Sequence, residues 1–253
     1  MNKALFFGGI LFLLLPFVLK VWDDRQQSNF VATYETHIEE MEDSKLQDCL
    51  DEAYEYNQKL YLTKIVQEDE YLKQLNLFQN GVMGSIEIPK IKLKLPIYHG
   101  TEESILTNGI GHLKESSLPI GGMNSHSILT GHRGLPEAQL FTRLDEMKEG
   151  DWFYITICGK RLPFQVCRIQ VIRPEEVDVL DIEPGKEWVS LVTCTPYGIN
   201  THRLVVTGEL NEMSGESDVV KTEIFSLKDR IFLFIIGGML VFGITYHLRK
   251  RGK

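Results

Sequence analysis

The sequence has few cysteines and lacks the spacings that usually hold a metal ion. Four cysteines occur among 253 residues, and none of them forms a Cys-x-x-Cys motif. No His-x-x-x-His pair is present either, so the residue pattern indicates no metal site. The sequence likewise indicates no organic cofactor. A chain of this length with four cysteines also does not predict a disulfide framework.

An excess of positive charge is also missing. The formal net charge is -8 at pH 7, and no basic stretch is interleaved with aromatic residues in the way that nucleic-acid binding favours. We therefore expect no nucleic-acid partner. With 43% hydrophobic and 25% charged residues, the chain is long enough for one well-buried domain and additional segments.

The chain carries two apolar runs, and the first is not followed by an Ala-x-Ala-like cleavage site. We expect residues 1–22 to be an uncleaved N-terminal membrane anchor and residues 231–246 a C-terminal transmembrane helix. A signal peptide and a buried core helix are the respective alternatives. The basic tail at 247–253 predicts that both termini are cytoplasmic, so the segment between the anchors would face outward, with 211–230 as a linker.

Residues 23–80 are acidic and have a helical pattern. Apolar residues recur at spacings of three and four around Leu46, Leu50, Ala53 and Leu60. One interpretation is a solvated amphipathic stalk, and the other is a segment of which part lies over an active site.

Residues 81–210 are predicted to form the main domain, and mainly from β-strands. Many short strands separated by Gly and Pro turns indicate a closed antiparallel barrel. Pro89 and Pro96 would limit their strands to edges or ends, and residues 105–113 read as one helical turn and a loop. The expected strands are 85–89, 91–98, 127–130, 152–158, 164–173, 189–193 and 204–210.

Residues 190–209 contain the strongest chemical signal. Cys194 would end one strand and Arg203 would begin the next, so an antiparallel pair brings a thiol and a guanidinium to one end of a sheet. His132, which follows the apolar run 127–130, is the best candidate for a base. A buried, inert Cys194 and an ordinary turn histidine are the alternatives, and only the fold decides whether the two side chains meet.

The remaining cysteines are expected to be free core thiols. Cys158 and Cys167 flank Gly159 to Val166, so a hairpin could place them on neighbouring strands, where a disulfide is the alternative. Cys49 falls on the apolar side of the predicted helix and is expected to pack.

The motifs LTGHRG and LVTCTPYGINTHRL resemble those of the sortases, cysteine transpeptidases of Gram-positive surfaces. Residues 81–122 and FTRLDEMKEGDWFYI are similar to class C, pilus-assembling sortases, and the resemblance covers roughly residues 46 to 246. It implies a closed eight-stranded β-barrel with N-terminal helices, two transmembrane helices, and Cys194, His132 and Arg203 as catalytic residues.

The same resemblance implies a reaction. Cys194 would cleave an LPxTG-like C-terminal sorting signal of a pilin subunit, form a thioester, and transfer the acyl group to a Lys amine of another pilin. The protein would act at the outer face of the membrane, with pilins and the lipid bilayer as partners. The alternatives are a housekeeping sortase that uses a cell-wall precursor, and a non-enzymatic surface binding barrel.

Two segments are candidates for covering or lining the expected site. Class C sortases carry a lid with an Asp-Pro-aromatic tripeptide, which does not occur in Tyr61 to Gln74. If this segment gates the site, Tyr71 is the candidate contact. Residues 173–186 form a long connection before the Cys194 strand, and the sequence favours a substrate wall there.

Overall fold

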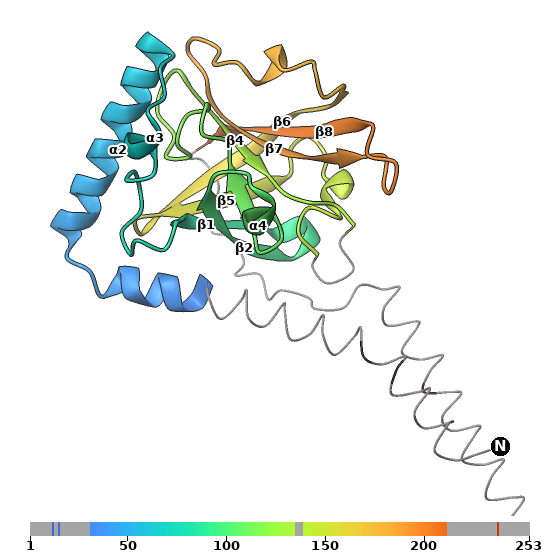
Figure 1. Ribbon diagram of the computed structural model, residues 1–253, viewed down its shortest axis with the longest axis horizontal. Helices are drawn as coiled ribbons and strands as arrows, with labels where there is room; N and C mark the ends of the chain where they lie inside the picture. Colours follow the sequence, from blue (N-terminus) through green and yellow to red (C-terminus); the bar gives the residue numbers. More distant parts are fainter. Residues whose placement is uncertain (1–11, 13–14, 16–30, 135–138, 212–236, 238–253) are drawn as a thin grey trace, which may run out of the picture.

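The computed structural model describes residues 12, 15, 31–134, 139–211 and 237 (Figure 1). Apart from residues 12, 15 and 237, the predicted anchors at 1–22 and 231–246 therefore lie outside the described residues, as do the tail at 247–253 and the linker at 211–230 except residue 211. Within the described ranges, no helix combines the length and the apolar character needed to cross a membrane.

Eight strands form a closed barrel in the order β1-β2-β3-β4-β7-β8-β6-β5, which confirms the predicted barrel. The pairs β2–β3 and β4–β7 are parallel and the other six are antiparallel, so the expected all-antiparallel barrel is wrong at two places. The strands are β1 Val82–Ile88, β2 Leu93–His99, β3 Ile110–His112, β4 Ser125–Thr130, β5 Trp152–Ile157, β6 Lys160–Ile172, β7 Glu187–Thr195 and β8 His202–Leu210.

Short helices connect these strands, and the 21-residue α2 and the four-residue α3 precede them. The elements are α2 Asp43–Thr63, α3 Glu68–Tyr71, η1 Pro89–Ile91, α4 Glu103–Leu106, η2 Leu144–Glu146 and η3 Asp178–Leu180. The prediction of one helical turn and a loop at 105–113 is wrong in part, because β3 occupies 110–112. β3 has only three residues, too few for period-two alternation to be visible in the sequence.

Pro96 lies inside β2 and not at its end, although the barrel has no free edge. The ladder between β2 and β3 begins at Ile97, so Pro96 is paired on one side only, with Ser85 of β1. A proline that donates no backbone hydrogen bond is therefore tolerated there. Pro89, in contrast, begins η1 directly after β1.

The barrel interior is filled by alternate residues of its strands. Phe153 and Phe164 are fully buried and stack with ring centroids 5.4 Å apart. A Cβ at residue 208 would come within 2.5 Å of the Phe153 ring, so Gly208 of β8 makes this close approach possible.

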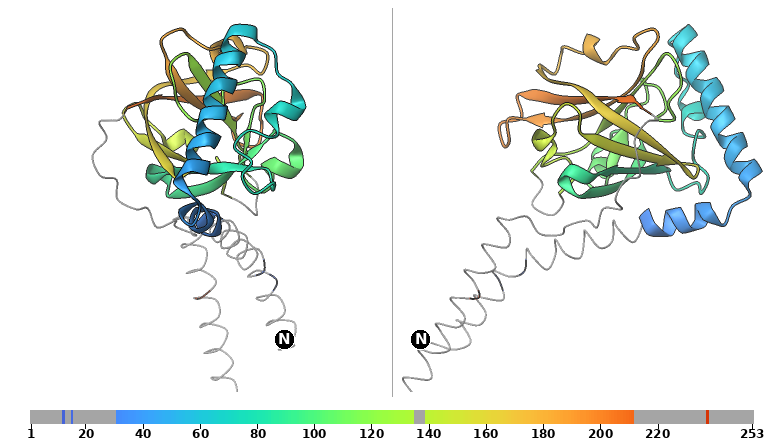
Figure 2. Two further views of the ribbon diagram at one scale, coloured as in Figure 1. Left: turned by 90° about the vertical axis from the view of Figure 1, so that its left-hand side faces the viewer. Right: turned by 180° about the vertical axis from the view of Figure 1, so that it is seen from behind.

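The predicted amphipathic helix is confirmed as α2, which lies along one side of the barrel (Figures 1 and 2). Leu50, Ala53 and Leu60 are buried against the barrel core. The buried Asn57 side chain donates to the carbonyl of Leu118 at 3.0 Å and accepts from its N–H at 2.7 Å. A buried amide with both functions satisfied fixes the helix in one position along the barrel.

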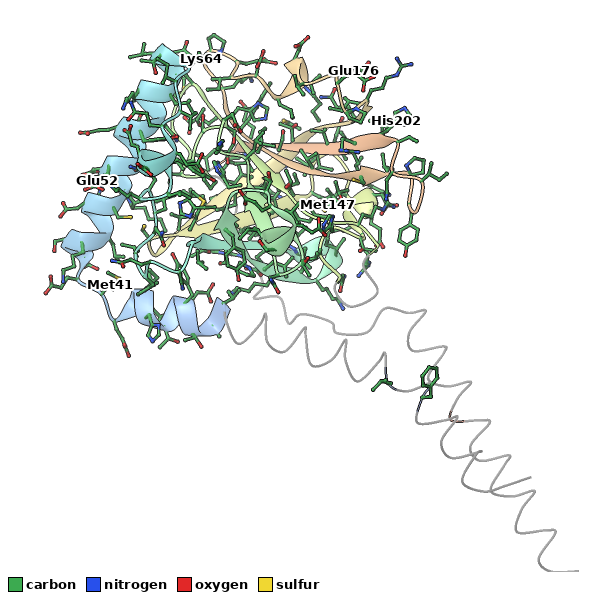
Figure 3. The ribbon with its side chains drawn as sticks, in the orientation of Figure 1. Met41, Glu52, Lys64, Met147, Glu176 and His202 are labelled. Atoms are coloured by element: carbon green, nitrogen blue, oxygen red, sulfur yellow. The ribbon has the colours of Figure 1, made fainter. Side chains whose placement is uncertain are left out.

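Tyr71 of α3 is a core residue, which does not fit the suggestion that it gates a site. Its side chain is only 1% exposed. Its hydroxyl accepts the N–H of Gly100 at 2.9 Å and lies 3.0 Å from both Nδ1 and the carbonyl oxygen of His112. Figure 3 shows Glu52 of α2, and Lys64 directly after α2, at the opposite side of the domain from His202, where β8 begins.

Among the described residues, His112 is buried with no charged hydrogen-bond partner, and this burial predicts a pH-dependent stability. Desolvation lowers its pKa from the usual 6.5 to about 4 and also lowers the pKa of His99 and His126. His112 Nε2 lies 2.8 Å from the carbonyl oxygen of Ser117, an arrangement that suits the neutral ring.

We expect the free energy of unfolding to fall as the pH drops below about 6.5. Between pH 6.5 and pH 4 the unfolded chain binds a proton at His112 and the folded chain does not, so protonation favours unfolding. The loss from His112 alone should be about 2 kcal/mol between pH 7.5 and pH 5. Urea unfolding at both pH values measures it. An NMR titration that places His112 near pH 6.5 would contradict the account.

Candidate active site

The β7–β8 hairpin brings Cys194 and Arg203 together, as the sequence predicts. The two residues are direct partners in the antiparallel ladder. Nη1 of Arg203 donates to the carbonyl oxygens of Asn200 at 3.3 Å and His202 at 3.1 Å, which anchors the guanidinium at the start of β8. Cys194 is half-buried and a free thiol.

The parallel pairing of β4 with β7 brings the segment that follows β4, which begins with Gly131 and His132, to the side of β7 away from β8. Thr130 is paired with Val192, and the N–H of Gly131 donates to the carbonyl oxygen of Val192 at 3.1 Å. The hydroxyl of Thr193 donates to the carbonyl oxygen of Gly131 at 2.7 Å. His132 comes two residues after Thr130, and Cys194 comes two residues after Val192. The register therefore sets the two residues level with each other.

Strand alternation places Cys194 and Arg203 on one face. Leu129, Leu191, Leu204 and Val206 belong to the main core inside the barrel. The residues next to them in each strand must therefore point outward. By this alternation Cys194 and Arg203 point outward. A separate outer-face cluster forms there from Ile128, Ile172, Val192 and Val205. Cys194 and Arg203 thus share an outer face with apolar residues beside them, and His132 follows two residues after the end of β4.

The β6–β7 connection covers part of this outer face. Val179 and Leu180 of η3 pack against the outer-face cluster. His126 Nδ1 lies 2.9 Å from the carbonyl oxygen of Asp181, and His126 Nε2 lies 2.8 Å from Oγ of Ser190. The long connection predicted at 173–186 is therefore tied to the barrel next to the candidate site.

The structure adds one residue that the sequence analysis missed. Nε2 of His132 lies 3.1 Å from Oε1 and 3.2 Å from Oε2 of Glu103, the first residue of α4. The side chain of His132 is 27% exposed, whereas that of Glu103 is 79% exposed. Glu103 belongs to a polar segment between two strands, and no motif in the sequence connects it with His132.

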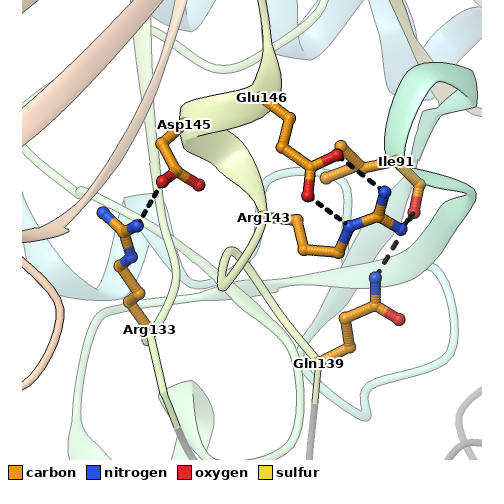
Figure 4. A network of polar contacts seen from close by, with 6 residues as sticks. All are labelled: Ile91, Arg133, Gln139, Arg143, Asp145 and Glu146. Carbon is orange, nitrogen blue, oxygen red and sulfur yellow. Dashed lines mark hydrogen bonds and ion pairs between the residues drawn. The ribbon is translucent and has the colours of Figure 1, made fainter. Parts of the chain in front are cut away.

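Arg133, which follows His132, braces the turns around the site. Its side chain is 8% exposed and donates through Nη1 to Oγ1 of Thr195 at 3.2 Å and through Nη2 to Asp145 at 2.5 Å. The guanidinium also lies 6.0 Å from the ring centre of Tyr197. Figure 4 shows the pair Arg133–Asp145 beside a second network, in which Arg143 binds Glu146 and the carbonyl oxygen of Ile91.

Known proteins are similar to this chain in sequence and in fold. A family model described as the sortase domain matches residues 86–211. The crystal structure of sortase C1 from Streptococcus agalactiae is 41% identical, with a TM-score of 0.70, and the match covers 74% of this chain and 100% of that one. Sortase C from Clostridium perfringens is also 41% identical, with a TM-score of 0.65, and covers 73% of this chain and 99% of that one.

Among curated proteins, Sortase A from Streptococcus agalactiae is 36% identical over 138 residues, which are 53% of this chain and 55% of that protein. The chain thus spans about half the length of that relative, whereas it spans the full length of the solved sortase C1. The family match includes the strands that carry Cys194 and Arg203 and the loop of His132. The chain belongs to the sortase family of cysteine transpeptidases, and class C sortases are among its structural neighbours.

Proposed function

We propose that the protein is a class C sortase that joins pilin subunits through their C-terminal sorting signals. The observation that carries the proposal is the pairing of Cys194 with Arg203 in the β7–β8 ladder, next to a β4–β7 ladder that ends two residues before His132 and Cys194. One similar solved structure is a Clostridium perfringens sortase C with the C-terminal cell wall sorting motif, 42% identical with a TM-score of 0.67.

In the first half-reaction, the sulfur of Cys194 attacks the carbonyl carbon of a Thr-Gly-type peptide bond. Arg203, paired with Cys194, is placed to stabilise the negative charge that develops on the carbonyl oxygen. His132 accepts the proton of the Cys194 thiol and donates it to the leaving amine, the C–N bond breaks, and a thioester remains on Cys194.

In the second half-reaction, a Lys amine of another pilin attacks the thioester. His132 now accepts the proton of the incoming amine, an isopeptide bond forms, and Cys194 leaves as the thiolate, which takes that proton back from His132. One imidazole serves both steps because the leaving and the incoming amine occupy the same place. Arg203 takes no part in the proton transfers, since a guanidinium stays protonated.

Glu103 is a positioning residue in this scheme. Both of its carboxylate oxygens are within hydrogen-bond distance of Nε2 of His132, so the carboxylate fixes the ring orientation. With Nε2 held in this way, proton exchange with the substrate falls to Nδ1. The pair is formed between α4 and the loop after β4, and thus connects two segments far apart in sequence.

The proposed setting is the outer surface of a Gram-positive cell membrane. Residues 1–22 and 231–246 would anchor the two ends, with both termini cytoplasmic and the barrel outside. The outer-face cluster and η3 would form the floor and one wall of the sorting-signal site. Their apolar side chains next to Cys194 suit the hydrophobic residues of an LPxTG-like signal.

The proposal is tested by intact mass of the detergent-solubilised full chain after mixing with an LPxTG-type peptide. We expect an acyl adduct that maps to Cys194 and is released by a pilin Lys. The Cys194→Ala variant should form no adduct while its circular dichroism stays unchanged, because only the thiol is removed. Cys167→Ala, which removes an exposed thiol on β6, is the matched control and should leave the adduct yield unaltered.

Other outcomes separate the alternatives. An adduct resolved only by water or by a peptidoglycan-like amine would replace pilin joining with the housekeeping activity. The absence of any adduct with a folded protein and several sorting peptides would favour a binding barrel. An adduct that persists in Cys194→Ala would contradict the assignment of the nucleophile.

We expect Glu103→Gln to lower kcat about tenfold or less and to leave KM nearly unchanged. The carboxylate acts on the His132 ring and is not placed to bind the peptide, so ground-state binding should survive. Its 79% exposure predicts little change in the melting temperature. Glu102→Gln, the neighbouring control, should retain the wild-type kcat. Equal effects of the two substitutions would remove Glu103 from the mechanism.

A further inference from the structure

Two thiols meet outside the candidate active site. Sγ of Cys158 lies 3.3 Å from Sγ of Cys49, although 109 positions separate the two residues in the sequence. Cys49 belongs to α2, and Cys158 lies in the tight turn between β5 and β6. The pairing differs from the sequence-based alternative, which joined Cys158 to Cys167.

The surroundings hold the two sulfur atoms in place. Ile157 and Lys160 are paired across the β5–β6 turn, and Cys158 has a positive φ of 46°, next to Gly159 at 76°. Cys158 is 3% exposed and belongs to the main core, and Cys49 packs against the same core from α2. Asn57, two turns further along α2, is bonded to Leu118. Both cysteines are therefore carried by fixed elements.

The hydrogen bond between the thiols makes them chemically unequal. Cys158 donates to Cys49, which lowers the pKa of Cys49 and raises the pKa of Cys158. The thiolate, which is the nucleophile in disulfide exchange, therefore forms first at Cys49. Cys49 is also the more exposed of the pair, so it is the sulfur that an external reagent reaches.

We propose that Cys49 and Cys158 form a disulfide bond that fastens α2 to the barrel. The Cys49 thiolate attacks a sulfur of an external disulfide, such as glutathione disulfide or a thiol-disulfide oxidoreductase, and releases one thiol. Cys158 then attacks the mixed disulfide at the Cys49 sulfur and releases the second thiol. Two thiols of the protein are oxidised, one external disulfide is reduced to two thiols, and the balance is complete.

The geometry favours this bond over any other in the described part of the chain. A disulfide has an S–S length of about 2.05 Å, so the sulfur atoms must approach by about 1.2 Å. Cys167 occupies the bulge of β6 at the register shift between Val166 and Arg168, and its Sγ contacts the carbonyl oxygen of Thr207. The Cys167 sulfur therefore faces Thr207, and Cys167 serves as an internal control for disulfide formation.

The bond would stabilise the domain without touching the candidate site. A link between residues 49 and 158 closes a long loop of the unfolded chain, which is the case in which a disulfide is most effective. α2 lies at one side of the barrel, and the β7–β8 turn with His202 lies at the other (Figures 1 and 3). The acyl-transfer chemistry proposed for Cys194 is independent of this bond.

The test is to equilibrate the full chain with excess glutathione disulfide, block the remaining thiols, and map cysteine-containing peptides without reduction. We expect one linked peptide pair, Cys49 with Cys158, and a melting temperature about 10 °C above that of the reduced protein. The linked pair should persist in Cys167→Ser and disappear in both Cys49→Ser and Cys158→Ser. In these two variants the oxidant should no longer raise the melting temperature.

Two results would overturn the proposal. One is alkylation of both Cys49 and Cys158 after full equilibration with the oxidant. The other is a disulfide that involves Cys167 or Cys194 in place of this pair. Because the readouts are peptide linkage and melting temperature, they stand whether or not the protein shows sortase activity.

Discussion

The parallel hydrogen bonding between β4 and β7 is the constraint on which the candidate site depends. The ladder runs from Ser125–Glu187 to Thr130–Val192, and Gly131 and Thr193 extend it by two further hydrogen bonds. A shift of one residue would move His132 out of step with Cys194 and turn a side chain to the other face. The register thus determines whether the proposed acid-base residue, His132, and the proposed nucleophile, Cys194, can act on the same bond.

Barrel closure adds the third group and the support beneath it. β8 pairs with β7 on the side away from β4, so Arg203 and His132 approach Cys194 from opposite sides. The outer-face cluster under η3 supplies apolar surface, and Arg133 joins the turn after β4 to Thr195 and Asp145. These contacts fix the end of β4, the end of β7 and the start of β8, so the polar side chains there are held in place before a substrate binds.

The sequence allowed the strands with clear alternation and the hairpin of Cys194 and Arg203 to be predicted, because those signals are local. It did not reveal β3, which is too short to show a period, or the parallel β4–β7 pairing, which joins residues about sixty positions apart. The contacts Glu103–His132 and Cys49–Cys158 were not predicted either, because each joins residues far apart in the sequence. Each depends on tertiary placement, and each side chain alone has an ordinary local context.

The most direct measurement is the rate at which a small alkylating reagent modifies each cysteine of the full chain at pH 7. We expect Cys194 to react faster than the more exposed Cys167, because the proposed mechanism gives it an acid-base partner in His132. The His132→Asn variant should lose most of this advantage, whereas His37→Asn should keep it. An inert Cys194, or one that reacts equally fast without His132, would contradict the claim that the β4–β7 register builds an active site.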